Sequence, residues 1–320
     1  MERLTLRDVR GLLVGHATDA DAATGCTVVL ATGGAVAGVD VRGAAPGTRE
    51  TDLLRPGSLV ERIHAICLAG GSAFGLAAAD GVMLWLAERG IGFPTDGGPV
   101  PIVPAAILYD LGVGRPDVRP TAEDGRAACE AAERGDEPIE GSVGAGTGTT
   151  VGKLAGPDAI RMGGVGMAGR RLADGHALAA MAVCNALGNV VGRDGRIIAG
   201  SRYLPAPPGA PRHLEHTTLA VIGTDLELDR SQCIRLAQLG HDALARSISP
   251  VHTMFDGDTV FALSTGSGTT MDGGDFMGLG MLAVEVLSEA IERSVLTATS
   301  LGGVPAVSGD EPQDEPRDEA

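Results

Sequence analysis

Aromatic residues are scarce in this sequence. Phenylalanine, tyrosine and tryptophan make up 2% of its 320 residues, whereas hydrophobic residues make up 44% and glycine occurs 49 times. This scarcity excludes a core filled by large rings, and we expect one built from aliphatic side chains with close contacts between backbones. The length allows one large domain or two ordinary ones, and the apolar content is typical of a globular protein.

Positive charge is also in short supply. The formal net charge is −16, which argues against nucleic acid and anionic membrane surfaces as partners. An acidic surface can favour substrates that bear an amine, but acidity is also a common aid to solubility. We take solubility as the simpler explanation of the charge.

The cysteine pattern gives no sign of disulfides or zinc. The five cysteines are scattered, form no CxxC pair and are expected to be reduced and mostly buried, as in a cytoplasmic protein. They are Cys26, Cys67, Cys129, Cys184 and Cys233. No cysteine–histidine cluster has zinc spacing, and we expect neither a metal nor a cofactor. The N-terminus lacks the apolar core of a signal peptide, and the most apolar stretch, 177–191, is too short to span a bilayer.

The order of expected strands and helices indicates a layered α+β fold. Strands are predicted at 26–30, 35–39, 63–68, 177–184 and 259–263, the first two joined as a hairpin by Gly33 and Gly34. Helices are predicted at about 72–89, 121–134, 229–248 and 278–299. Because the two kinds alternate irregularly, a doubly wound parallel sheet is less favoured. We expect a single domain over residues 1–307 and a disordered acidic tail over 308–320.

The junction before Thr217 is the most informative stretch. The proline-rich segment 204–211 resists regular structure, and an apolar β-branched run begins at Thr217. Thr217 and Thr218 thus stand where a loop is predicted to become a buried strand. A threonine hydroxyl needs a base, and the α-amino group of the same residue, with a pKa of about 7.7–8.0, can act as one. Cleavage of the His216–Thr217 bond would create that amino group.

Further candidate groups each have a plain structural alternative. Asp256 and Asp258 are two apart at a strand entrance, where they share a face and could take up a proton or hold a hydroxyl and an amine. The alternative is an Asp-Gly turn with solvated carboxylates. Lys153 ends a glycine-rich stretch that lacks the first glycine and the hydroxyl of a phosphate loop, so it is alternatively a lysine at a bend. The seven histidines lie outside known catalytic motifs, and each is expected at the surface or satisfied in the core.

In order along the chain, several of these pieces resemble the self-processing L-aminopeptidase/D-esterase and β-aminopeptidase family, and most of all its 6-aminohexanoate-oligomer hydrolases. The pieces span about residues 60–300. They are 66–72, 105–110, 144–146 with Gly152 and Lys153, 183–188, Thr217 with Thr218, and 252–253 with 256–259.

The resemblance implies the α+β fold of the self-processing aminopeptidases and ornithine acetyltransferase, a four-layer αββα sandwich. It implies a precursor cut into chains 1–216 and 217–320 that stay together, and a homo-oligomer, such as a tetramer, of the processed units. The implied substrates are small peptides with a free amino terminus, esters or ω-amino oligomers.

Carried over by position, the resemblance makes Thr217 the nucleophile. It matches Asp256 and Asp258 to the paired acidic positions that orient and activate the nucleophile, and Lys153 to a lysine beside it. It matches Asn185 and Tyr109 to polar groups of the reaction centre that could stabilise an oxyanion.

The sequence departs from the family at His216, because the residue before the cut is usually small or an asparagine. Two other functions stay open. One is an acyltransferase of the ornithine acetyltransferase type, and the other is an uncleaved, non-catalytic binding protein that keeps the fold.

Overall fold

The computed structural model describes residues 4–137, 139–201, 216–266 and 271–309. The strands are Leu13–Asp19 (β1), Thr24–Val41 (β2), Thr48–Arg49 (β3), Arg62–Ala69 (β4), Ala105–Ile107 (β5), Thr150–Val151 (β6), Arg161–Met162 (β7), Gly164–Arg171 (β8), Ala177–Asn185 (β9), Asn189–Val191 (β10), Ile197–Ala199 (β11), Thr217–Thr224 (β12), Ile248–Ser249 (β13) and Thr259–Ser264 (β14). The α-helices are Ala78–Glu88 (α1), Ala122–Arg134 (α2), Arg230–Ser247 (α3) and Gly273–Leu296 (α4). The proline-rich segment 204–211 and most of the acidic tail lie outside the described residues.

A nine-stranded sheet forms the centre of the described structure. Its strands follow the order β3-β5-β4-β2-β14-β12-β9-β8, and β1 pairs with β2 beside this path. Most neighbours are antiparallel, whereas β4 with β5 and β12 with β14 are parallel. The expected preference for a layered α+β fold over a doubly wound parallel sheet agrees with this mixed sheet.

Strand β2 corrects one expectation. Residues 26–30 and 35–39 do not form a hairpin but belong to one strand of 18 residues. Gly34 has a φ of +80°, and the pairing with β4 shifts register between Leu30 and Ala35. The glycines therefore make an irregularity within a strand rather than a reversal, because β4 continues alongside on both sides of it.

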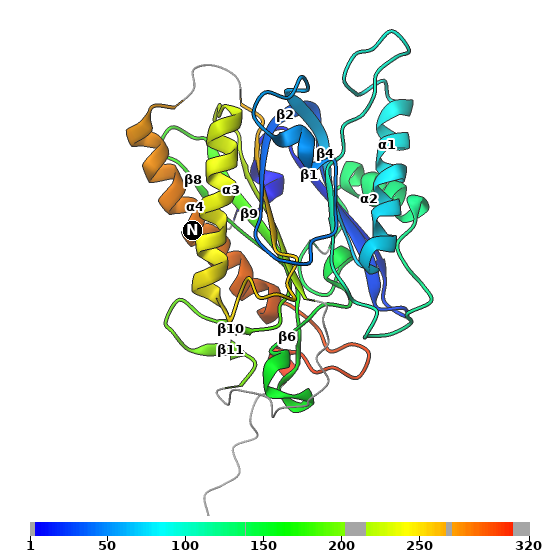
Figure 1. Cartoon of the computed structure of the whole chain (residues 1–320), viewed down its shortest axis with the longest axis vertical. Helices are drawn as coiled ribbons and strands as arrows, with labels where there is room; N and C mark the ends of the chain where they lie inside the picture. Colours follow the sequence, from blue (N-terminus) through cyan, green and yellow to red (C-terminus); the bar gives the residue numbers. More distant parts are fainter. Residues whose placement is uncertain (1–3, 138, 202–215, 267–270, 310–320) are drawn as a thin grey trace, which may run out of the picture.

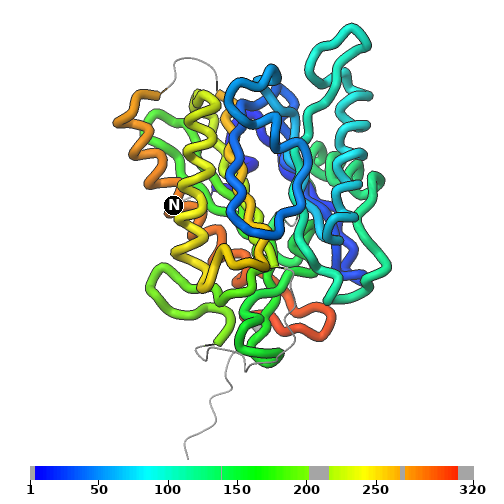
Figure 2. The backbone as a smooth tube through the Cα atoms, in the orientation of Figure 1, coloured from blue at the N-terminus to red at the C-terminus, as the bar shows by residue number. Residues whose placement is uncertain are grey.

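The helices lie on opposite sides of the strands. Figure 1 shows α3 and α4 on one side, and α1 and α2 on the other, and the backbone trace in Figure 2 gives the same arrangement. One buried cluster joins α3 and α4 to β9, β12 and β14, and a second joins α1 and α2 to β2 and β4. A third cluster gathers the opposite faces of these strands, with Ile66, Met181, Val221 and Phe261 among its members.

Glycine lets helices approach the strands closely. A Cβ on Gly15 of β1 would overlap the backbone of Ala132 in α2, and one on Gly166 of β8 would overlap the backbone of Ala290 in α4. These contacts agree with the predicted core of aliphatic side chains and tight backbone packing. All five cysteines are free and buried, as expected.

Helix boundaries follow their capping residues. Thr121 and Asp124 form the predicted capping box of α2, and Asp229 caps α3. Helix α4 starts earlier than predicted, at Gly273, because the carboxylate of Asp272 accepts hydrogen bonds from the first turn. Within the described ranges, no helix has the length and apolar character needed to cross a membrane.

Candidate active site

The predicted loop-to-strand junction lies at the buried start of β12. Thr217 is the first residue of β12, where it pairs with Asn185 of β9. The parallel pairing with β14 begins only at Leu219, opposite Thr259. The residues just before β14 lie beside the residues at the start of β12. Among them, Asp256 forms a parallel bridge with His216. This register brings the two halves of the predicted site together.

The two threonines of the junction have different surroundings. The Thr217 hydroxyl donates to the carbonyl oxygen of His216 at 2.5 Å. The Thr218 hydroxyl lies 4.0 Å from the sulfur of Cys184, inside the core beneath α3 and α4. Of the two hydroxyls, only that of Thr217 contacts the bond that the sequence marks for cleavage.

Lys153 connects the junction to β9. Its Nζ lies 2.9 Å from Oδ1 and 3.2 Å from the carbonyl oxygen of Asn185, and 3.1 Å from Nδ1 of His216. The Asn185 amide donates in turn to the carbonyl oxygen of Tyr109 at 2.8 Å. Lys153 and Asn185, far apart in the sequence, thus meet at Thr217 and His216, and the main chain of Tyr109 joins them through Asn185.

Lys153 is also unusual because the sequence contains no other lysine. Lysine and arginine together number 25, and Lys153 is the only lysine among them. A lysine ammonium is a compact charge with freely directed donors, whereas a guanidinium is a planar fork. Three acceptors around one nitrogen suit the ammonium.

Asp258 holds the start of β12 from the other side. Its Oδ1 accepts the main-chain N–H of Thr218 at 2.7 Å. Its Oδ2 lies 2.7 Å from Nδ1 of His252 and accepts the main-chain N–H of the same residue at 3.2 Å. His252 has a φ of +53°, an unusual conformation for a residue with a side chain.

Asp256, the other acid of the pair, is bound by its own turn. Burial, together with the nearby charge of Asp258, raises its pKa above the usual range. Its Oδ2 accepts the main-chain N–H of Thr253 at 2.6 Å. The two predicted acids therefore have different partners. Asp258 accepts a hydrogen bond from the main chain of β12, and Asp256 accepts one from the main chain of its own turn.

Three groups of this site were not predicted from the sequence. Gly257 donates its N–H to the carbonyl oxygen of His216 at 2.8 Å, and the Phe255 carbonyl oxygen accepts the N–H of His216 at 3.2 Å. The third group is the His252 side chain on Asp258. Main-chain donors carry no residue signature, but the position of Gly257 between two aspartates was a usable signal.

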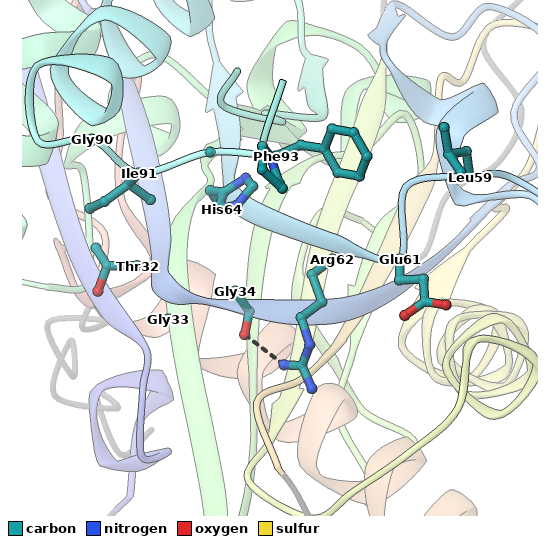
Figure 3. Close-up of a pocket in the computed structure, with 12 residues that line it drawn as sticks. Thr32, Gly33, Gly34, Leu59, Glu61, Arg62, His64, Gly90, Ile91 and Phe93 are labelled. Atoms are coloured by element: carbon teal, nitrogen blue, oxygen red, sulfur yellow. Dashed lines mark hydrogen bonds between the residues drawn. The ribbon is translucent and has the colours of Figure 1, made fainter. Parts of the chain in front are cut away.

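A cavity of about 490 Å³ lies apart from these residues. Figure 3 shows it beside the irregularity of β2, where Arg62 donates to the Gly34 carbonyl oxygen and His64, Ile91 and Phe93 line the wall. None of its lining residues belongs to the predicted site. Among the described residues, no group of three or more histidine, cysteine or acidic side chains is arranged to hold a metal ion.

Comparisons with known proteins agree on one family. The model of peptidase family S58 matches residues 5–307. An uncharacterised aminopeptidase of Mycobacterium tuberculosis is 41% identical, over 94% of this chain and 96% of the relative. A 6-aminohexanoate-oligomer endohydrolase of Kocuria sp. is 34% identical, over 90% of this chain and 85% of the relative.

Solved structures show the same fold. A β-aminopeptidase of Burkholderia sp. superimposes with a TM-score of 0.74 at 23% identity, covering 95% of this chain and 90% of the other. An L-aminopeptidase D-Ala-esterase/amidase of Ochrobactrum anthropi, described as a variant of the Ntn hydrolase fold, gives 0.71 at 20% identity, with coverages of 94% and 88%. The chain therefore belongs to peptidase family S58, as a self-processing amide hydrolase with the α+β fold of the Ntn hydrolases.

Proposed function

We propose that the chain cleaves its own His216–Thr217 bond and then uses the freed Thr217 as an N-terminal nucleophile on substrate amides. The products of self-cleavage are chains 1–216 and 217–320, which stay associated. The observation that carries the proposal is the environment of one carbonyl group. The His216 oxygen accepts hydrogen bonds from the Thr217 hydroxyl at 2.5 Å and from the Gly257 N–H at 2.8 Å.

Self-cleavage starts with attack of the Thr217 Oγ on the carbonyl carbon of His216. A C–O bond forms, the C–N bond breaks, and the hydroxyl proton passes to the Thr217 nitrogen, which becomes an amine. The Gly257 N–H faces the oxygen on which negative charge develops. Water then adds to the ester carbon, the C–Oγ bond breaks, and a proton returns to Oγ. Chain 1–216 is left with a carboxyl terminus.

Turnover repeats these steps on a substrate. The Thr217 amine accepts the Oγ proton while Oγ bonds to the substrate carbonyl carbon, and the leaving amine takes up the proton as the C–N bond breaks. Water hydrolyses the acyl-enzyme ester and restores the hydroxyl. The reaction needs no group beyond the side chains, the main chain and water.

The surrounding polar groups support these steps. Asp258 would orient the start of β12 through Thr218. Asp256, whose pKa is raised and whose main chain pairs with that of His216, would exchange a proton there. Lys153 would add positive charge beside the imidazole of His216, the residue whose carbonyl reacts, and it holds Asn185. The resemblance also makes Asn185 and Tyr109 candidate stabilisers of the oxyanion. The Asn185 amide donates one hydrogen to the Tyr109 carbonyl oxygen, so its second hydrogen would be the donor.

The finer architecture and the substrates are part of the same proposal. Three buried clusters, two between helices and strands and one between strand faces, support a four-layer αββα sandwich. We further propose a homo-oligomer, such as a tetramer, of processed units. Short peptides with a free amino terminus, esters and ω-amino oligomers are the substrate classes, in line with the names of two relatives and of one solved neighbour.

Mass spectrometry of the purified protein tests the cleavage. Wild type should give masses of chains 1–216 and 217–320, and Thr217→Ala should stay one chain. Thr218→Ala is the matched control and should still be cut, because its hydroxyl faces Cys184. An intact wild type that hydrolyses amides would contradict the proposal.

The single lysine makes the nucleophile easy to identify. Amine-directed labelling of the processed protein can modify only Lys153 and the free α-amino groups. Labelling should therefore mark Thr217 in wild type and abolish amide hydrolysis.

If an added amine takes the acyl group faster than water does, the enzyme is instead an acyltransferase.

A further inference from the structure

The residue on the acyl side of the scissile bond is bound as a substrate would be. His216 is 2% exposed. Its N–H donates to the Phe255 carbonyl oxygen at 3.2 Å, and its carbonyl oxygen accepts the Gly257 N–H at 2.8 Å. Its Nδ1 lies 3.1 Å from Nζ of Lys153. Main-chain donor, main-chain acceptor and side chain of one residue are thus all engaged.

The segment that binds His216, residues 255–257, is itself held by hydrogen bonds from residues on its other side. The Ala45 N–H donates to the carbonyl oxygen of Asp256 at 2.9 Å, and the Arg42 N–H donates to that of Asp258 at 3.0 Å. These bonds do not involve His216. Departure of the new carboxyl terminus at His216 after self-cleavage would expose a short strand edge with one free acceptor, on Phe255, and one free donor, on Gly257.

We propose that His216 marks the subsite for the acyl residue of the substrate. The first residue of the substrate adds to this edge in the register of His216, with its amine on the Phe255 carbonyl oxygen, its carbonyl on the Gly257 N–H and its side chain toward Lys153. The inference rests on the proposed function, because it requires Thr217 to be the nucleophile in both reactions.

The register selects α-amino-acyl substrates. In the bridge, the N–H and C=O that bind Phe255 and Gly257 belong to one residue and are separated by a single carbon. A β-amino acid places an extra carbon between them. The long methylene chain of a 6-aminohexanoyl group moves the amine away from Phe255 altogether. Short peptides with an α-amino terminus therefore fit the edge best.

Lys153 selects a side chain that accepts a hydrogen bond. In His216 the accepting atom, Nδ1, is bonded to Cγ, and the Oδ1 of asparagine occupies the same position. Leucine has the same branching with a methyl group there and leaves the ammonium without this partner. Histidine and asparagine should thus be preferred over leucine by roughly tenfold, the usual effect of one hydrogen bond to a charged group.

Two rankings test the subsite. The first is the rate of self-cleavage of wild type, His216→Asn and His216→Leu, measured by mass spectrometry as the appearance of chain 217–320. The second is kcat/KM of processed wild type for the p-nitroanilides of histidine, asparagine, leucine, β-alanine and 6-aminohexanoate. One subsite predicts one order in both series, with histidine and asparagine above leucine. In the substrate series, the α-amino-acyl compounds of histidine and asparagine should exceed those of β-alanine and 6-aminohexanoate.

Lys153→Met provides an independent measurement. The ratio of kcat/KM for the histidine and leucine substrates should fall toward one in this variant, whatever its absolute rate. Unrelated orders in the two series, or a 6-aminohexanoyl substrate that is cleaved fastest by a processed enzyme, would overturn the subsite and leave the nucleophile in place. A chain that stays whole and inert would overturn the proposed function itself.

Discussion

The Gly257 N–H and the His216 carbonyl oxygen are 2.8 Å apart, and Gly257 has no side chain where the Thr217 hydroxyl lies. The glycine between the two aspartates therefore serves two purposes. In the proposed self-cleavage it would supply a donor to the carbonyl that is attacked and leave room for the Thr217 hydroxyl that attacks. Neither purpose is visible in the turn-forming role that an Asp-Gly pair suggests.

Gly257→Ala should slow self-cleavage. The new Cβ would lie 2.8 Å from the Thr217 Oγ and 2.8 Å from the Ala45 carbonyl oxygen, so that the donor and the nucleophile cannot both keep their places. We expect a loss of about 10²-fold or more, as for other oxyanion donors. Gly273→Ala, where a Cβ meets nothing within 4 Å, is the matched control. Mass spectrometry measures the rate of cleavage. If Gly257→Ala cleaved itself at the wild-type rate, Gly257 would have no role as a donor to the His216 carbonyl.

Lys153→Arg should not behave as a conservative change. The Lys153 Nζ contacts two oxygens of Asn185 and a nitrogen of His216, in directions that a planar guanidinium cannot all serve. Self-cleavage and amide hydrolysis should both fall by roughly 10-fold to 100-fold, the cost of one or two charge-assisted hydrogen bonds. The exposed Arg171 offers the reverse control, since Arg171→Lys should process normally. Equal rates for wild type and Lys153→Arg would argue against a positional role of the ammonium.

His252 should affect the rate of self-cleavage through its contact with Asp258. Its Nδ1 lies 2.7 Å from the carboxylate that also binds the Thr218 N–H, and its φ is +53°. Asparagine tolerates this conformation and can donate from the same position, whereas leucine can do neither. His252→Leu should therefore cleave itself about tenfold more slowly than His252→Asn. Thermal unfolding of both variants in a Thr217→Ala background separates this effect from a loss of stability.

Asp110 should make stability depend on pH. Burial raises the pKa of this carboxyl, which binds Thr24 and the Gly71 N–H, to about 6. The folded chain then holds a proton that the unfolded chain releases near pH 4, so this contribution to stability is present below pH 4 and is lost as the pH rises through about 6. Between pH 4 and pH 7, Asp110→Asn should gain about 2–3 kcal/mol relative to its parent.

Denaturant unfolding in the uncleaved Thr217→Ala background measures this difference. Asp117→Asn should leave the slope over the same range nearly unchanged, because Arg115 lowers the pKa of that exposed carboxyl below its usual value. Parallel pH profiles for Asp110→Asn and its parent would show that Asp110 does not titrate in this range.

Much of the fold could be predicted from local patterns. The strands at 63–68 and 259–263 and the helix that follows Asp229 appear close to their expected positions, because apolar periodicity and capping residues act over a few residues. The hairpin expected at Gly33 and Gly34 is wrong for the opposite reason. Whether two glycines reverse a strand or only distort it depends on the neighbouring strand, here β4.

The candidate site divides in the same way. The residue types alone made Thr217, the two aspartates and Lys153 candidates, each beside a plain structural alternative. The family resemblance favoured these candidates and added Asn185 and Tyr109. The structure brings all of these side chains or their main chains to one place. It also adds Phe255 and Gly257, whose contribution comes from main-chain groups that every residue carries.

The sequence by itself determined which chemical groups this protein has. A lone lysine, two junction threonines and two aspartates around a glycine are properties of residue order, and they define the reactions that are possible. Only the tertiary structure decided which of these groups face one another. The parallel pairing of β12 with β14 and its antiparallel pairing with β9 set the register that places Gly257, Lys153 and Asn185 around the His216–Thr217 bond. A shift of one residue in either pairing would turn these groups away, because side chains alternate between the faces of a strand.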